Sequence, residues 1–72
     1  MSNKNYFNEA ERIGNELIKI GKSDKDLDTL FNLLINNKFK NNYLNVMVYI
    51  PDVLAEKNFY IVNVSPFELK KL

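Results

Sequence analysis

Apolar residues recur every three or four positions in the first half of the chain, which predicts two amphipathic helices. The first spans residues 5–20, and its apolar positions are Tyr6, Ala10, Ile13, Leu17 and Ile20. Gly21 should end it, because glycine readily adopts the left-handed conformation after a helix. The second spans about 24–38 with Ser23 as its N-cap, and its apolar positions are Leu27, Leu30, Phe31, Leu34 and Ile35. Only Lys22 separates the two caps, which predicts a tight helical hairpin.

Two runs rich in Val, Ile, Tyr and Phe follow, at residues 43–50 and 59–64. These residue types favour β-strands. The eight residues that join the runs, 51–58, are too few for a parallel crossover, so we expect an antiparallel pair. Residues 51–57 are predicted to form a helical turn that Asn58 closes. The Asn-rich segment 36–42 is predicted to be a loop that Phe39 anchors to the core.

The segment Ser65-Pro66-Phe67-Glu68 predicts a last helix, from Pro66 to the C-terminus. Ser65 suits the N-cap, Pro66 suits the first helical position, and Glu68 completes a capping box. The sequence thus predicts one small α+β domain over residues 1–72, in the order α-α-β-β-α. A helical hairpin packs on an antiparallel strand pair, a short C-terminal helix follows, and residues 1–4 form a flexible terminus.

Strand alternation divides the predicted strand pair into two faces. One face is expected to pack on the helical hairpin and contains Leu44, Val46, Val48, Ile50, Tyr60, Val62 and Val64. The other face is expected to bind a partner protein and contains Tyr43, Met47, Tyr49, Phe59 and Ile61. An exposed aromatic and apolar patch is typical of interfaces, and open strand edges invite strand addition. Two alternatives stay open. Either the two faces have the opposite roles, or the C-terminal helix covers the second face within the monomer.

The length of the chain strengthens the prediction of a partner. A 72-residue domain buries only about 60% of its unfolded surface, and domains this small often need a disulfide, a metal or a second chain. The chain has no cysteine and no histidine, which excludes disulfides and the usual zinc sites. We therefore expect a homo-oligomer or a larger protein partner.

Enzymatic residues are scarce. Ser23 and Ser65 are explained as helix caps, and no histidine or cysteine could activate a nucleophile. Glu9 and Glu16 lie on a polar side of the first predicted helix, where an unperturbed carboxyl is a poor general acid. The chain also has no glycine-rich phosphate loop. We expect no catalysis, no cofactor, no metal and no small-molecule substrate.

Charge bears on the second function considered, nucleic-acid binding. Ten Lys and Arg balance nine Asp and Glu to a net charge of +1, which is weak for that function. In this alternative, Tyr43, Tyr49, Phe59 or Tyr60 would stack on bases beside Lys38, Lys40 and Lys57. The sequence has no apolar run long enough for a membrane span and no signal-peptide core at its start, so we expect a soluble cytoplasmic protein.

The function that these patterns favour is a small non-catalytic protein-binding module. It would dimerise or dock on a larger protein through the strand pair. The small size and the richness in Asn, Lys, Ile and Tyr, typical of an AT-rich genome, favour a regulator or inhibitor encoded by a phage or another mobile element.

Overall fold

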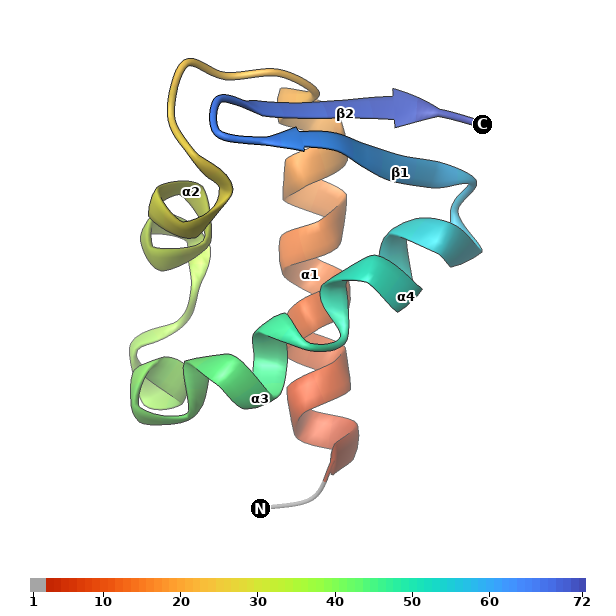
Figure 1. The fold of residues 1–72 in the computed structure, drawn as a ribbon. Helices are drawn as coiled ribbons and strands as arrows, with labels where there is room; N and C mark the ends of the chain where they lie inside the picture. Colours follow the sequence, from red (N-terminus) through yellow and green to blue (C-terminus); the bar gives the residue numbers. More distant parts are fainter. Residues whose placement is uncertain (1–2) are drawn as a thin grey trace.

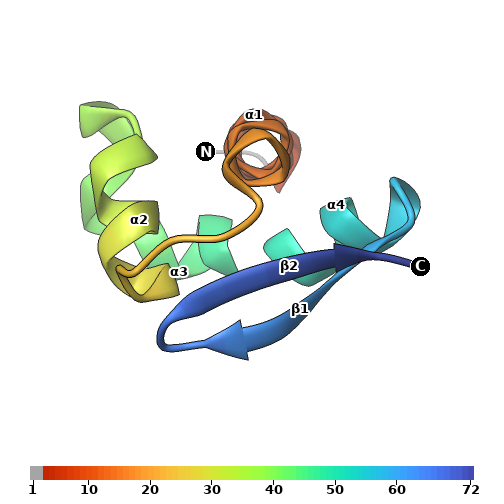
Figure 2. The ribbon, with the colours of Figure 1, turned by 90° about the horizontal axis from the view of Figure 1, so that it is seen from above.

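The computed structural model describes residues 3–72 as a group of helices and an antiparallel strand pair. The elements are α1 (Asn3–Ile20), α2 (Leu27–Leu34), the 3-10 helix η1 (Asn37–Asn42), α3 (Tyr43–Met47), α4 (Ile50–Glu56), β1 (Phe59–Val64) and β2 (Phe67–Lys71). Helix α2 lies beside α1, α3 and α4 cross one face of α1, and the strand pair crosses its C-terminal end (Figure 1). Seen from above, β2 lies nearer α1 and β1 lies on the outside (Figure 2). Helices that pack on an antiparallel strand pair confirm the predicted α+β class.

Helix α1 forms where the apolar periodicity predicted it. Ala10, Ile13 and Leu17 are fully buried, and Gly21 ends the helix with a φ of 70°. At Gly14 an added Cβ would lie 2.7 Å from a methyl carbon of Val53, so the missing side chain lets α4 pack closely against α1. Of the predicted flexible terminus, residues 3–4 belong to α1, and residues 1–2 lie outside the described residues.

Helix α2 is shorter than predicted, and the prediction of Ser23 as its N-cap is wrong. Asp26 is the N-cap, and its side chain accepts a hydrogen bond of 2.6 Å from the backbone N–H of Thr29. The tight helical hairpin is also wrong, because residues 21–25 leave α1 and run beside β2. The predicted loop at 36–42 is largely the 3-10 helix η1, and Phe39 is buried as expected.

The first predicted strand, 43–50, is wrong, because these residues form α3 and the start of α4. The residues in this run that suit strands also recur at helical spacing. Tyr43, Val46, Met47 and Ile50 lie three or four apart and turn toward the core, whereas Leu44 and Val48 are exposed. A helical period therefore fits the run as well as a strand period does, and α1 supplies the apolar surface that such a helix needs.

The C-terminal helix is also wrong, because residues 67–71 form β2, which pairs with β1. Ser65 and Pro66, joined by a cis peptide bond, make the two-residue loop between the strands. The fixed φ of proline suits a tight turn as well as a helix start. Phe67 and Leu69 are buried and alternate with Glu68 and Lys70, which is the two-residue period of a strand. The observed order is therefore α-α-α-α-β-β, with η1 between α2 and α3.

The core lies between α1, the shorter helices and the inner face of the strand pair. Its buried apolar side chains are Ala10, Ile13, Leu17, Leu30, Phe31, Ile35, Phe39, Val46, Ile50, Val53, Leu54, Phe67 and Leu69. The helices contribute ten of these, Ile35 directly follows α2, and β2 contributes Phe67 and Leu69. The strand β1 contributes only the half-buried Phe59 and Ile61, so it forms the outer margin of the fold.

Candidate protein-binding surface

The five residues predicted to bind a partner do not form one exposed face. All five are half-buried and pack against the core. The Tyr49 ring lies edge-on to Phe7 at 5.7 Å between centroids, and the Tyr43 ring lies 5.7 Å from that of Phe31. Met47 lies on α3 beside these helical contacts. Tyr43, Met47 and Tyr49 therefore hold helices together, whereas Phe59 and Ile61 lie on the outer strand.

The face predicted to pack on the helices is largely exposed. Tyr60 and Val62 are each 44% exposed and Val64 is 54% exposed, so the expected burial of these β1 residues is wrong. Leu44 and Val48 are also exposed, on α3 and at its end. Of the predicted inner face only Val46 and Ile50 are buried, because their run is helical.

The predicted faces of residues 59–62 are inverted in β1, and a β-bulge interrupts the strand after them. The pairing register shifts between Ile61 and Asn63, so Asn63 lies opposite Glu68 while Ile61 lies opposite Leu69. The strict alternation used for the sequence prediction therefore does not run through the whole strand. An extra residue of this kind bends a strand and changes which side chains share a face.

A groove of about 290 Å³ lies between β1 and α4. Phe59, Tyr60 and Ile61 form one wall, and Pro51, Leu54 and Ala55 form the other. Successive side chains of a strand point to opposite faces, so a groove that contacts three consecutive residues follows the edge of the strand. β2 occupies the other edge of β1. The groove therefore lies along the outer edge of β1.

The outer edge of β1 has no neighbouring strand in residues 3–72. Leu72 N–H donates to the carbonyl of Asn58, which fixes the alternation of the ladder. Tyr60, two residues further along, is paired with Lys70 and directs its backbone groups toward β2. Phe59 and Ile61 consequently direct theirs to the open edge. Unpaired N–H and C=O groups beside an apolar groove are what an added strand requires.

The outer edge of β2 differs, because residues 21–25 cover its first half. Leu69 N–H donates to the carbonyl of Gly21 at 2.7 Å, and Phe67 N–H donates to the carbonyl of Lys25 at 2.9 Å. Ser23 N–H donates to the carbonyl of Phe67 at 3.0 Å. The strand pair therefore has one edge that is covered along its first half and one edge that is open.

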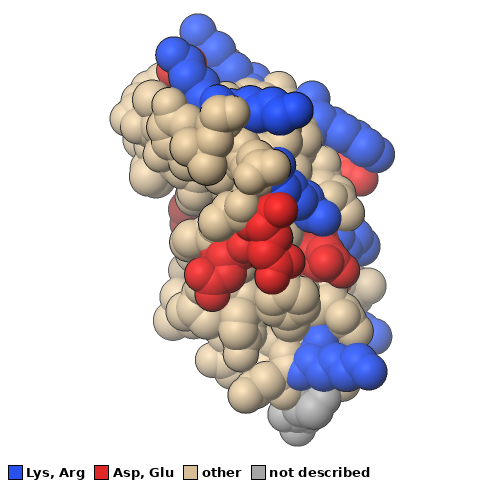
Figure 3. Space-filling view, turned by 90° about the vertical axis from the view of Figure 1, so that its right-hand side faces the viewer, with Lys and Arg blue, Asp and Glu red and all other residues tan. Residues whose placement is uncertain are grey.

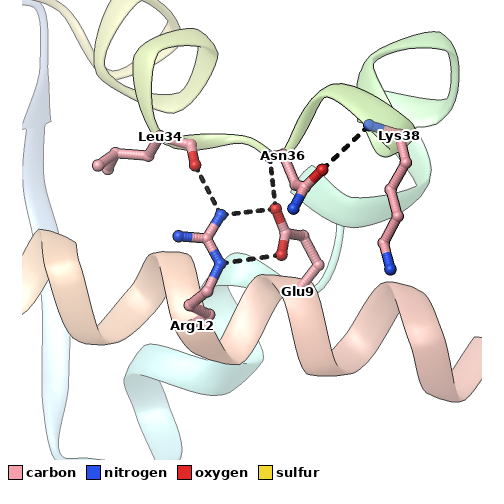
Figure 4. Close-up of polar contacts among 5 residues, drawn as sticks. All are labelled: Glu9, Arg12, Leu34, Asn36 and Lys38. Atoms are coloured by element: carbon pink, nitrogen blue, oxygen red, sulfur yellow. Dashed lines mark hydrogen bonds and ion pairs between the residues drawn. The ribbon is translucent and has the colours of Figure 1, made fainter.

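A second, polar pocket of about 330 Å³ surrounds Glu9 on α1. The Glu9 side chain is buried, and Arg12 donates to both of its carboxylate oxygens, at 3.0 and 2.7 Å. Arg12 also donates to the carbonyl of Leu34 at 2.6 Å, and Asn36 N–H donates to Glu9 at 2.7 Å (Figure 4). The pair thus ties the segment after α2 to α1. The sequence predicts a solvated position for Glu9, and no sequence pattern indicates that the backbone groups of Leu34 and Asn36 bond to this ion pair.

The environment of Glu9 changes its acidity. Burial raises the pKa of the carboxyl group, but the hydrogen bonds from Arg12 and from the backbone of Asn36, with the nearby charges of Arg12 and Lys38, outweigh burial. The net result is a pKa below the ordinary value of 4.5, so Glu9 is ionised at neutral pH. No buried side-chain nitrogen or oxygen in residues 3–72 lacks a hydrogen-bond partner, and this cluster is no exception. We interpret the cluster as a structural tie.

Basic and acidic side chains are interspersed over the side of the molecule at the right of Figure 1. Lys and Arg gather toward the top and bottom of this face, with Asp and Glu in a band between them (Figure 3). Lys38 and Lys40 belong to η1, at the opposite side of the molecule from the start of β1, and Lys57 follows α4 (Figure 1). These three lysines, which the nucleic-acid alternative places together, do not form one continuous basic stripe.

Two further features of residues 3–72 bear on binding. No group of three or more Asp, Glu, His or Cys side chains is arranged there to hold a metal ion. None of the helices in this range is both long enough and apolar enough to cross a membrane.

Comparisons of the chain with models of protein families, with curated proteins and with solved structures returned no match. The functional proposal therefore depends on the residues of the chain itself.

Proposed function

We propose that the chain is a small, non-catalytic protein-binding module whose interface is the outer edge of β1 and the groove beside it. The single observation that carries this proposal is the open edge, where Phe59 and Ile61 direct unpaired backbone groups next to an apolar groove. A partner would add a strand to this edge. Main-chain hydrogen bonds would supply affinity and the groove would select side chains.

The exposed apolar residues of β1 extend the same surface. Tyr60 and Val62 lie beside the open edge and are each almost half exposed. Of the residues predicted from the sequence, Phe59 and Ile61 line the groove and stay in the proposed interface. Tyr43, Met47 and Tyr49 contribute indirectly, because they pack the helices that carry the α4 wall.

A role as a regulator or inhibitor fits a small domain that binds a protein and carries out no chemistry. In that role the open edge of β1 would pair with a strand edge or an extended segment of the target protein and block it. An origin in a phage or another mobile element belongs to the same proposal and is supported by size and composition alone.

The test is site-directed photo-cross-linking in an extract of cells that express the protein. A benzophenone amino acid at position 60 should cross-link a discrete protein, and the same group at Val48, which is 66% exposed, should not. Free Tyr60→Lys protein should fail to compete for the cross-linked product, and free Leu44→Lys protein should compete like the wild type. Equal cross-linking from positions 60 and 48 would contradict the proposal.

The nucleic-acid alternative is measured in parallel. Binding of single-stranded oligonucleotides at low salt that disappears at physiological salt reflects nonspecific contacts with the phosphates. Specific binding that survives physiological salt and that Lys38→Glu removes would replace the protein-binding proposal.

A further inference from the structure

We infer that the strand added to the open edge of β1 is β1 of a second copy of this chain, antiparallel and related by a two-fold axis at Tyr60. The inference rests on the proposed function and names the partner at the same surface. The result would be a four-stranded sheet in the order β2-β1-β1-β2, with one two-fold axis at its centre. A two-stranded sheet alone is marginal in water, and a wider sheet with a covered face is not.

Charge favours a second copy at this edge. None of the six residues of β1, Phe59–Val64, is charged, whereas β2 carries Glu68, Lys70 and Lys71. A two-fold interface brings the same surface of both copies together, so a charged edge would face its own charge. The edge of β1 meets no such repulsion. It also lacks the lysine or proline with which edge strands commonly prevent pairing.

The direction of the backbone groups selects the register. Only residues with outward N–H and C=O groups can exchange hydrogen bonds across the new edge, which before the bulge means Phe59 and Ile61. With the axis at Tyr60, Phe59 lies opposite Ile61 of the second copy, and Tyr60 lies opposite Tyr60 of the second copy. Aromatic pairs and pairs of an aromatic with a β-branched residue are the favourable cross-strand pairs.

The other registers that satisfy the backbone lose these pairs. An axis at Ile61 places Phe59 opposite Asn63 of the second copy, beyond the bulge. An axis at Phe59 places Ile61 opposite Lys57 of the second copy, which sets an apolar side chain against a charge. The axis at Tyr60 is the one that pairs apolar residues throughout the segment 59–61.

The groove supplies the space for this pairing. Side chains directly opposite in an antiparallel pair lie on the same face. Ile61 of the second copy would therefore lie beside Phe59, on the inner face, against Pro51 and Ala55 of α4. Tyr60 of each copy would cover the other on the outer face, where each ring is now 44% exposed.

The experiment uses the absence of cysteine in the chain. In the proposed register, position 60 meets itself in a non-hydrogen-bonded pair with Cα atoms about 4.5 Å apart, which lies within the range of a disulfide. The Tyr60→Cys variant should form a disulfide-linked dimer under mild oxidation. At about 10 μM protein it should form about 100-fold faster than in the control Val48→Cys, since pairing raises the local thiol concentration to the millimolar range.

A second measurement needs no substitution. In the wild-type protein at high concentration, amide hydrogen exchange should be slow at Phe59 and Ile61 and should accelerate on dilution, while exchange at Tyr60 changes little. Sedimentation over the same dilution should show a dimer dissociating to a monomer. This pair of results identifies the edge that associates even if Tyr60→Cys folds poorly.

A wild-type protein that stays monomeric at millimolar concentration, with fast exchange at Phe59 and Ile61, would overturn the inference. So would cross-linking at Tyr60→Cys no faster than at Val48→Cys. If the benzophenone at position 60 then still cross-links a different protein, the proposed function stands and only the second copy fails. If position 60 captures nothing, both fail.

Discussion

The two edges of the strand pair differ in what completes them. The first half of the outer edge of β2 is completed within the chain, because Gly21, Ser23 and Lys25 bond to Phe67 and Leu69. The outer edge of β1 ends at a groove and at backbone groups with no neighbouring strand in residues 3–72. The covered edge is part of the folded domain, and the open edge is the one at which we propose binding. Substitutions at the covered edge should therefore change stability, and those at the open edge should change association.

The largest effect is expected at Phe67, at the start of β2 on the covered side. Its ring is fully buried, so Phe67→Ala should lower the free energy of unfolding by about 3–5 kcal/mol. A domain this small has little more stability than that, and the variant should be largely unfolded by circular dichroism. A folded Phe67→Ala protein would show that the β2 side contributes less than its burial indicates.

Glu9 tests a second internally satisfied region, the tie between α1 and the segment after α2. Glu9→Gln should lower the free energy of unfolding by about 1–3 kcal/mol at neutral pH, because it weakens the charged hydrogen bonds to Arg12 and Asn36. Urea denaturation at neutral pH measures the change. Glu16→Gln, whose partner Lys19 is 3.6 Å away on the surface, is the matched control and should change little.

The Glu9 effect should also depend on pH. The pKa of Glu9 is lowered in the folded protein, so its contribution is present above the ordinary pKa of 4.5 and is lost as the pH falls through the folded-state value. The stability difference between wild type and Glu9→Gln should therefore be constant near neutral pH and shrink below pH 4.5. A difference that grows in acid would contradict this account.

Gly21 should show a smaller effect, at the point where the chain leaves α1 to cover β2. Its φ of 70° is costly for residues with a Cβ, so Gly21→Ala should lower the free energy of unfolding by about 1–2 kcal/mol. Gly21→Asn should cost less, since asparagine tolerates this conformation. Thermal unfolding of the two variants side by side measures the difference, and equal losses would show that the conformation is not the cause.

The smallest change in stability is expected at the open edge. Tyr60→Lys should alter the free energy of unfolding of the dilute protein by no more than about 0.5 kcal/mol, because Tyr60 is a partly exposed surface residue. The wild-type melting temperature should rise with protein concentration as association stabilises the folded state, and that of Tyr60→Lys should not. Leu44→Lys, at a comparably exposed position on α3, should keep the concentration dependence.

The sequence predicts a helix correctly where the apolar residues follow the helical period and no other. The α1 stripe and its end at Gly21 were clear, because neither a strand nor a longer helix fits them. The run 43–50 satisfied two periods at once, and the tertiary contact with α1 decided for the helix. Residues 65–68 likewise carried a signal common to helix starts and tight turns. The α+β class is correct despite both errors, because the predicted strand 43–50 is helical and the predicted C-terminal helix is the strand β2.

The candidate surface was predicted less well than the fold class. Phe59 and Ile61 were singled out, and they line the groove. Alternation groups Phe59 with Ile61 and Tyr60 with Val62, as the structure does, but it does not say which face turns inward, and the bulge between Ile61 and Asn63 has no local signal in the sequence. The cover of β2 by residues 21–25 depends on backbone hydrogen bonds, which side-chain patterns do not encode. Which edge stays open is therefore a property of the assembled fold.

In the proposed binding mode, residues 21–25 also limit how many molecules can join one sheet. Within residues 3–72 the outer edge of β1 is vacant, whereas the start of the outer edge of β2 is already occupied by the backbone of residues 21–25. In the proposed binding mode, a chain that pairs through β1 has used the strand edge that residues 3–72 leave fully vacant, so strand pairing should end at a finite complex instead of propagating into a fibril. Under this proposal each molecule supplies one strand edge to an assembled sheet, so the protein would be univalent in that assembly.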